Sequence, residues 1–213
     1  MKTIYAITPA NENLKKLTTK VNDLLEVGIS TFQYRSKNED LEIIRKNASF
    51  LLEIIKSQDG ELIINDFPHI ALEIGADGFH LGEKDYYNQK NQKFLKKYSN
   101  IINENYITGF SCKWNLDLLK NPPEELINWD YLAVGSFFQS ATKDDALIPP
   151  NEKVIKDALL CTNKPIYAIG GINSENIMNL KMLGYERFAI SKGLFYEEVN
   201  NIKNILIINN EKN

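Results

Sequence analysis

The segment STFQYRSK, residues 30–37, combines β-favouring side chains with two cations. Gln33, Arg35 and Lys37 follow one another at every second position. Because side chains alternate between the two faces of a strand, we expect these three on one face. Burying a guanidinium, an ammonium and an amide together costs free energy unless an anion compensates them. The pattern indicates an anion-binding site, although this segment alone is equally well explained as a solvated strand edge.

Further polar residues follow other β-rich runs. Asn65 and Asp66 come directly after ELII, and Asp85 comes shortly after DGFHL. A third run, YLAVGS, is followed by Ser140, Thr142 and Lys143. Either aspartate alone is also explained as a helix N-cap, whose side chain accepts a backbone N–H bond. The joint placement of all these residues after strand-like runs is harder to explain by capping.

Two glycine-containing stretches have the character of phosphate-binding loops. AIGGIN places Gly170 and Gly171 before a helix expected at Ser174, and AISKGLF contains Ser191 and Gly193. Glycine lets backbone N–H groups approach an anion, and a helix N-terminus adds a partial positive charge. An ordinary tight turn also explains a pair of glycines, but the presence of both loops favours phosphate binding.

The elements that must position these residues alternate along the chain. Eight β-rich runs are predicted as strands, over residues 3–8, 31–35, 61–65, 77–81, 106–111, 131–136, 165–170 and 187–191. Segments with helical periodicity separate the strands. This order predicts a single (β/α)8 barrel of the α/β class, with a doubly wound open sheet as the alternative. Barrels of this type carry catalytic residues at the C-terminal strand ends and often bind phosphate after the seventh and eighth strands.

Length and charge exclude several classes of protein. We expect one domain, 1–213, because no Gly- or Ser-rich linker divides the 213 residues. Lys and Arg total 25 against 28 Asp and Glu, which argues against nucleic-acid and polybasic membrane partners. Neither a signal-peptide core nor a bilayer-spanning run is present. The chain has only two cysteines, Cys112 and Cys161, which form no disulfide framework, so we expect a cytoplasmic protein. A homo-oligomer is left open as an alternative to a monomer.

Beyond these patterns, the sequence resembles the thiamine phosphate synthase (thiamine-phosphate pyrophosphorylase) family over nearly its whole length. The resemblance rests on the motifs IYAIT, QYRSK, LIIND, GADGFHLGEKD, TGFS, YLAVGSFFQSATK, YAIGGIN and AIS. Each motif is short, but their order and spacing together are specific. The resemblance implies a Mg²⁺-dependent transferase of thiamine biosynthesis. Such an enzyme joins hydroxymethylpyrimidine diphosphate to hydroxyethylthiazole phosphate, which gives thiamine phosphate and pyrophosphate.

The same resemblance assigns site residues. The catalytic cations that hold the diphosphate would be Arg35, Lys37 and Lys143, helped by Asn65. Gln33 and Ser111 would contact the pyrimidine, and Asp66 and Asp85 would bind Mg²⁺. The thiazole phosphate side would be lined by Thr142, Gly171, Ile190 and Ser191. These roles agree with the chemistry, because a departing diphosphate needs its growing negative charge neutralised and Mg²⁺ suits carboxylate and phosphate oxygens.

Three further residues near these motifs are not assigned to a substrate or to the metal. Cys112 is expected to be a small packing residue, since no nucleophilic side chain is required. His80 is expected to be either a hydrogen-bonded structural histidine or a catalytic one. His69 lies at an expected helix start and is given no functional role.

The sequence departs from the family pattern at a few positions. Glu83 replaces a usual glutamine and is expected to weaken diphosphate binding by like-charge repulsion. Ser140 replaces a threonine, Lys192 replaces a small residue, and GSFF replaces G-P-I-F. One alternative is a thiazole tautomerase, which relies on a histidine after the fifth strand, where this chain reads SCKWN. A noncatalytic thiamine phosphate binding barrel is the other.

Overall fold

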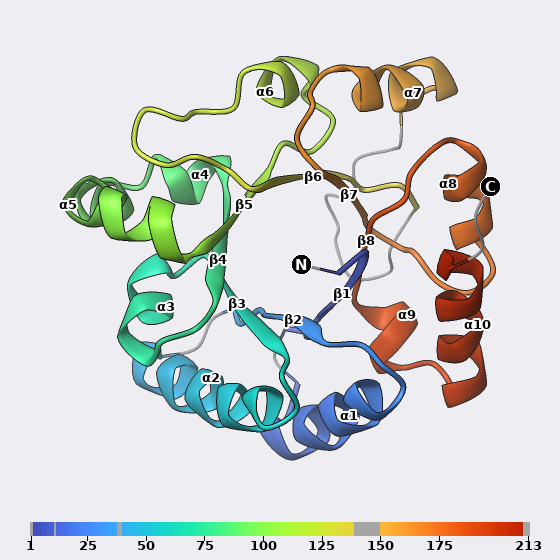
Figure 1. The fold of residues 1–213 in the computed structure, drawn as a ribbon, viewed down its shortest axis with the longest axis horizontal. Helices are drawn as coiled ribbons and strands as arrows, with labels where there is room; N and C mark the ends of the chain where they lie inside the picture. The colour runs from blue at the N-terminus through green and yellow to red at the C-terminus, as the bar shows by residue number, and fades with distance from the viewer. Residues whose placement is uncertain (1, 11, 38–39, 139–149, 211–213) are drawn as a thin grey trace.

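Eight parallel strands form a closed barrel in the computed structural model, which describes residues 2–10, 12–37, 40–138 and 150–210. Each strand pairs with its neighbours in chain order, and β8 pairs with β1 through Ile4–Phe188, Tyr5–Ala189 and Ala6–Ile190 (Figure 1). The strands are β1 (Ile4–Ile7), β2 (Thr31–Tyr34), β3 (Glu61–Asn65), β4 (Gly78–Gly82), β5 (Ile107–Ser111), β6 (Tyr131–Gly135), β7 (Ile166–Ile169) and β8 (Phe188–Ile190). The predicted (β/α)8 barrel is confirmed, and pairing of β1 with β8 excludes the open sheet.

Helices surround the barrel on its outer side (Figure 1). Those within the described residues are α1 (Leu14–Glu26), α2 (Leu41–Lys56), α3 (Pro68–Ile74), α4 (Glu83–Tyr86), α5 (Gln89–Asn105), α6 (Leu116–Lys120), α7 (Glu152–Leu160), α8 (Ile177–Met182), α9 (Lys192–Phe195) and α10 (Val199–Asn210). Helix α1 illustrates the predicted periodicity, because it buries Leu17, Val21, Leu24 and Leu25. Of the described helices, none combines the length and apolar character needed to cross a membrane.

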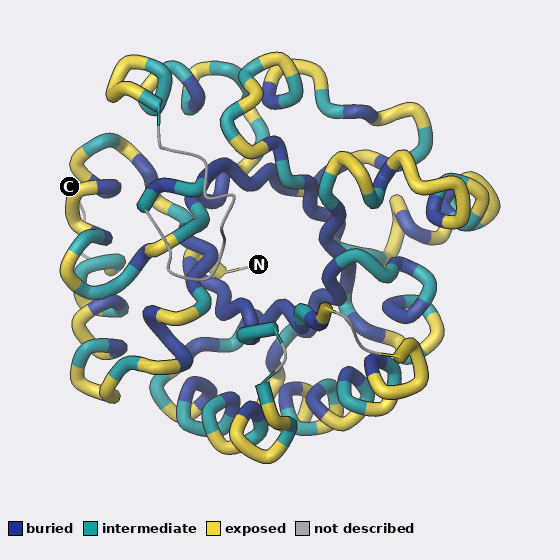
Figure 2. Tube along the Cα trace, turned by 180° about the vertical axis from the view of Figure 1, so that it is seen from behind, coloured by how far each residue is buried: buried dark blue, intermediate teal, exposed yellow. Residues whose placement is uncertain are grey.

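The main hydrophobic core lies between the strands and the helices. Outward-facing strand residues such as Phe32, Leu62 and Phe79 are fully buried against the apolar faces of the helices. Figure 2 shows the buried residues as a ring that follows the barrel wall, with exposed residues on the outer sides of the helices. Parallel strands covered on both faces need apolar side chains in this way.

The barrel interior is filled by aromatic side chains. Tyr5, Tyr131 and Tyr167 pack together there, with ring centroids 5.0 to 5.9 Å apart. Gly109 on β5 makes room for them, because a Cβ atom at this position would overlap the ring of Tyr131. The interior is therefore a packed core, and the barrel itself can bind a ligand only at the ends of its strands.

We expect Gly109→Ala to destabilise the barrel, because the added methyl group overlaps a ring that cannot move away in a filled interior. Overpacking of this kind costs about 1–3 kcal/mol of unfolding free energy. Urea unfolding of both proteins measures the difference. In a protein that already carries Tyr131→Leu, the Gly109→Ala change should cost less unfolding free energy, because the smaller side chain at position 131 leaves room for the methyl group. An equal cost in both backgrounds would contradict this explanation.

Candidate active site

The C-terminal ends of the strands bring the predicted site residues to one rim of the barrel. Asn65, Ser111 and Ile190 are the last residues of β3, β5 and β8. The loops and short helices that follow the strands carry Arg35, Lys37, Asp66, Asp85, Gly171 and Ser191. Three predicted residues, Ser140, Thr142 and Lys143, lie outside the described residues.

Strand β2 ends one residue earlier than predicted, at Tyr34. Gln33 is therefore the only predicted site residue within this strand, and it is buried, whereas Lys37 in the following loop is exposed. The buried Thr8 extends the pairing of β1 and β2 beyond the strand ends. Its Oγ1 accepts a bond from the Arg35 N–H at 2.9 Å, and its own N–H donates to the Gln33 carbonyl at 2.9 Å. Thr8 was missed in the sequence, although it ends the YAIT motif.

Neither aspartate is a helix cap, so the capping interpretation is wrong. Helix α3 follows Asp66, but its N-cap is Phe67, without a side-chain cap bond. Asp85 lies within α4, and the next helix, α5, is capped by Asn88, whose Oδ1 accepts the Lys90 N–H at 2.9 Å. Both carboxylates are thus left available for a ligand.

The two carboxylates lie close enough to repel one another. Burial and the neighbouring Asp85 carboxylate raise the pKa of Asp66 to about 7, and the nearby charges of Arg35 and Lys37 oppose this rise. The same interactions show that these four side chains share one electrostatic environment. A cation bound between the carboxylates would remove their repulsion.

The donor set fits a hard divalent cation. No group of three or more His, Cys, Asp and Glu side chains that could hold a metal occurs within the described ranges. Asp66 and Asp85 thus offer a pair of oxygen ligands, and Mg²⁺ is commonly bound by one or two carboxylates with phosphate and water. Glu83 is exposed at the start of α4, where solvent screens its charge, so the expected like-charge repulsion of the diphosphate is reduced.

A cavity of about 330 Å³ lies beside the two aspartates. Its lining includes Lys37, Asp66, Asp85, His69, Lys90 and Asn91. The last three come from α3 and α5 and were not predicted as site residues. His69 is placed between the rings of Phe67 and Phe94, at centroid distances of 6.0 and 6.2 Å. Burial lowers the pKa of His69, so its imidazole is neutral in this cavity at neutral pH.

His80 connects the barrel interior to the rim. Its Nδ1 lies 3.0 Å from the Tyr131 hydroxyl, and its Nε2 lies 2.8 Å from the Ser111 Oγ. The imidazole stacks on the Tyr131 ring at 5.5 Å. Burial lowers the pKa of His80 to about 4, so it is a neutral, hydrogen-bonded group. This arrangement favours the structural role and fixes the position of Ser111.

The loops after β7 and β8 form a common wall on another part of the rim. Gly171 has φ +69°, and a Cβ atom there would come within 2.8 Å of the Phe138 carbonyl oxygen. Its own carbonyl accepts a bond from the Asn176 side chain at 2.9 Å. A Cβ atom at Gly193 of α9 would overlap the Ile172 carbonyl, so α9 packs directly on the β7 loop. The helix expected at Ser174 begins later, at Ile177.

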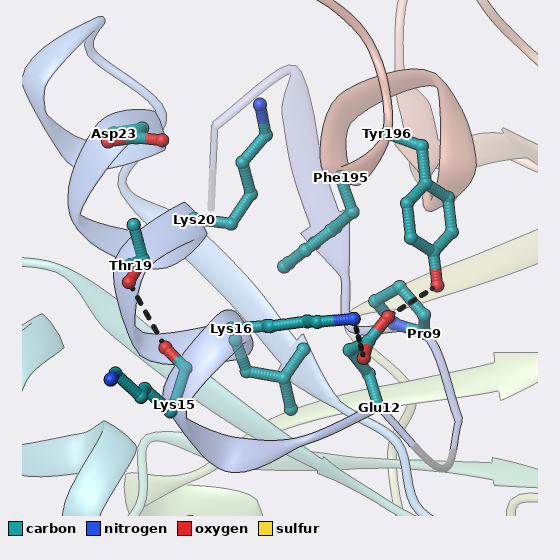
Figure 3. Close-up of a pocket in the computed structure, with 10 residues that line it drawn as sticks. Pro9, Glu12, Lys15, Lys16, Thr19, Lys20, Asp23, Phe195 and Tyr196 are labelled. Atoms are coloured by element: carbon teal, nitrogen blue, oxygen red, sulfur yellow. Dashed lines mark hydrogen bonds and ion pairs between the residues drawn. The ribbon is translucent and has the colours of Figure 1, made fainter.

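A second cavity, of about 400 Å³, lies between α1 and α9 (Figure 3). Figure 3 shows the Tyr196 hydroxyl and the Lys16 ammonium directed at the same Glu12 carboxylate, at 3.0 and 3.7 Å. Lys20 donates to the Glu197 carbonyl at 3.0 Å. None of the predicted substrate or metal residues that the structure describes lines this cavity, so we place the candidate active site at the strand ends beside Asp66 and Asp85.

His80 should make stability depend on pH. Its folded pKa of about 4 is below the ordinary value of 6.5, so between these values the unfolded chain binds more protons. The free energy of unfolding therefore falls as the pH drops from about 6.5 toward 4. In His80→Gln this contribution is absent, and the decrease over the same range should be smaller. Urea unfolding at several pH values measures both slopes, and equal slopes would contradict the depressed pKa.

Similar sequences and a similar fold are found among known proteins. Residues 4–194 match the family model described as thiamine monophosphate synthase. A thiamine-phosphate synthase of Nitrosospira multiformis is 36% identical over 192 residues, which are 90% of this chain and 78% of the relative. One of Nitrosomonas eutropha is 34% identical, over 90% of this chain and 86% of the relative. The solved thiamine phosphate pyrophosphorylase from Pyrococcus furiosus shares the fold, with a TM-score of 0.78 at 23% identity over 97% and 95% of the two chains. The chain belongs to the thiamine monophosphate synthase family.

Proposed function

We propose that the protein is a thiamine phosphate synthase that joins hydroxymethylpyrimidine diphosphate to hydroxyethylthiazole phosphate with Mg²⁺ as cofactor. The observation that carries this proposal is the electrostatic coupling of Arg35, Lys37, Asp66 and Asp85 on one rim of the barrel. It supplies cations for a diphosphate and a carboxylate pair for a metal in one place. Both cysteines are free, in keeping with the cytoplasmic location that we also propose.

The diphosphate would bind beside the aspartates, in the cavity that Lys37 lines. Arg35 would approach it from the segment that Thr8 holds, and the buried Asn65 from the end of β3. Lys143, which lies outside the described residues, is assigned to the same group by the resemblance. During the reaction the bond between the pyrimidine methylene carbon and the diphosphate oxygen breaks, and its electron pair stays on the diphosphate. Arg35 and Lys37 would stabilise that charge.

Asp66 and Asp85 would hold the Mg²⁺. When bound, the ion supplies further neutralisation of the negative charge on the diphosphate. The assignment is supported by the closeness of the two carboxylates, because burial and the Asp85 charge raise the pKa of Asp66 and a bound cation would offset this repulsion.

The pyrimidine would lie above the filled barrel interior. The Nε2 of Gln33 is buried close to the Tyr5 and Tyr131 hydroxyls but makes no hydrogen bond of good geometry among the described residues, so it would be able to donate to a ring nitrogen or another acceptor. Ser111, fixed by the neutral His80, would provide a second polar contact.

The thiazole nitrogen would then form the new bond to the methylene carbon with its own lone pair. This sequence of events needs no protein nucleophile, and Cys112, whose pKa burial raises to about 12, is not a thiolate at neutral pH.

The thiazole phosphate would bind at the wall formed after β7 and β8. Gly171 and Ser191 would present backbone or hydroxyl donors to the phosphate, and Ile190 would contact the apolar side of the substrate. Thr142 is assigned to the same side but lies outside the described residues.

The tautomerase alternative requires a histidine after β5 and has no support in the structure. The segment after β5 holds Trp114, which packs on Phe137 at 4.6 Å and donates to the Ser136 carbonyl at 3.1 Å.

The reaction itself tests the proposal. The protein is incubated with both substrates and Mg²⁺, and thiamine phosphate and pyrophosphate are quantified together. Equal amounts of the two products are expected. A protein that binds thiamine phosphate but releases neither product would instead be the noncatalytic barrel, and one that only aromatises a thiazole phosphate tautomer would be a tautomerase.

Replacement of either metal carboxylate should reduce turnover strongly. For Asp66→Ala or Asp85→Ala we expect a decrease of about a hundredfold or more, because charge stabilisation of the leaving diphosphate is lost. Glu83→Gln removes an exposed carboxylate from the same short helix as Asp85 and serves as the control that should not lower turnover. Full activity of the unaltered protein in excess chelator would show that no metal is needed.

The two phosphate sites should respond to different substitutions. Lys37→Ala should raise the KM for the pyrimidine diphosphate about tenfold or more, because a charged hydrogen bond is lost. Gly171→Ala should instead raise the KM for the thiazole phosphate, because the added Cβ atom meets Phe138 and strains a residue at φ +69°. Steady-state kinetics with each substrate varied in turn separates these effects. A similar rise of both constants in both variants would mean that the sites are assigned wrongly.

A further inference from the structure

The first turn of α5 lies over both proposed metal ligands. Asn91, in this turn, is only 8% exposed, and its Nδ2 donates to the Asp85 carbonyl at 2.9 Å. The same Nδ2 lies 3.4 Å from the Asp66 carbonyl, a longer second bond. One amide group thus contacts the backbone of both carboxylate residues, which follow neighbouring strands of the barrel.

This contact has one chemically sensible orientation. An amide NH2 group has two hydrogens, so it can serve two carbonyl oxygens at once. The opposite orientation would place the Oδ1 of Asn91 against the same two carbonyl oxygens, so that acceptors would face acceptors. The arrangement therefore requires an amide, and neither an aspartate nor an apolar residue at position 91 can replace it.

The backbone of Asp66 needs such support. Asp66 has φ +67°, a left-handed conformation that is uncommon for residues other than glycine. Its N–H donates to the His80 carbonyl at 2.9 Å, which fixes one side of the residue. Asn91 contacts the carbonyl on its other side. Because the two carboxylates repel one another, a fixed backbone is needed to keep them at a common site.

The neighbouring residue on α5 offers a matched comparison. Gln92 donates from its Nε2 to the Tyr86 carbonyl at 2.8 Å, so it also ties α5 to α4 through an amide and a carbonyl. Unlike Asn91, it has no bond to the segment after β3. Loss of Gln92 should therefore loosen α5 on α4 without releasing Asp66 from Asp85.

We propose that Asn91 is a positioning residue, which sets the affinity for the metal by holding the backbone of Asp66 and Asp85 at a fixed separation. The inference rests on the proposed function, since it requires that these two carboxylates bind Mg²⁺. It adds a determinant of that site on α5, outside the strand ends and the loops that directly follow them.

Direct metal titration tests the inference without the reaction. Free Mn²⁺, used in place of Mg²⁺, is counted by electron paramagnetic resonance as the protein is titrated. Asn91→Ala should raise the Mn²⁺ dissociation constant about tenfold, the size typical of lost outer-shell partners. Asn91→Leu keeps the branched shape of the side chain, with a somewhat larger volume, but removes the donors, and it should weaken metal binding in the same way. Gln92→Ala should stay within about twofold of the unaltered protein.

Two further measurements separate positioning from a general loss of structure. Thermal unfolding of Asn91→Ala and Gln92→Ala compares the cost of losing each amide, and the KM for the thiazole phosphate should be unchanged in both. Metal affinity that is unchanged in the Asn91 variants, or weakened equally by Gln92→Ala, would overturn the inference while leaving the proposed function intact. Failure of the unaltered protein to bind Mn²⁺ would instead refute the metal assignment, and the inference with it.

Discussion

The pairing of β1 with β8 is the interaction on which the rest of the molecule depends. It joins the first strand of the chain to the last and converts a row of parallel strands into a ring. Since every strand of a closed parallel barrel points the same way, residues far apart in sequence, such as Arg35 and Ser191, are brought to one rim. The tyrosines inside the ring close it to ligands, so the chemistry is confined to the strand ends.

At that rim, the arrangement is governed by charge. Two carboxylates are held together against their mutual repulsion, and two cations lie near enough to affect them. Like charges in a partly buried site cost free energy, and the metal ion and diphosphate of the proposed function would compensate them. The neutral imidazole of His80 behaves differently, because it carries hydrogen bonds between the interior and Ser111 without adding charge. The structure thus separates the charged part of the rim from a neutral polar part.

Much of this could be predicted from the sequence, for identifiable reasons. All eight strands were predicted, because β-rich runs recur between segments of helical periodicity, and the barrel followed from their number and order. The closeness of Asp66 and Asp85 followed from their positions after neighbouring strands. The sequence could not show that neither aspartate caps a helix, because Asp is favourable at an N-cap and the actual start of a helix depends on packing. Thr8 and Asn91 were missed because both act on backbone groups that only the folded chain places near them.

The short helices α4 and α9 show how the family pattern can change without harm to the fold. Each begins with an exposed residue that departs from the pattern, Glu83 in α4 and Lys192 in α9. Their inner faces are buried, at Tyr86 in α4 and at Leu194 and Phe195 in α9. A change of charge at Glu83 or Lys192 can therefore alter the electrostatic character of the rim without disturbing the buried side chains that hold each short helix on the barrel.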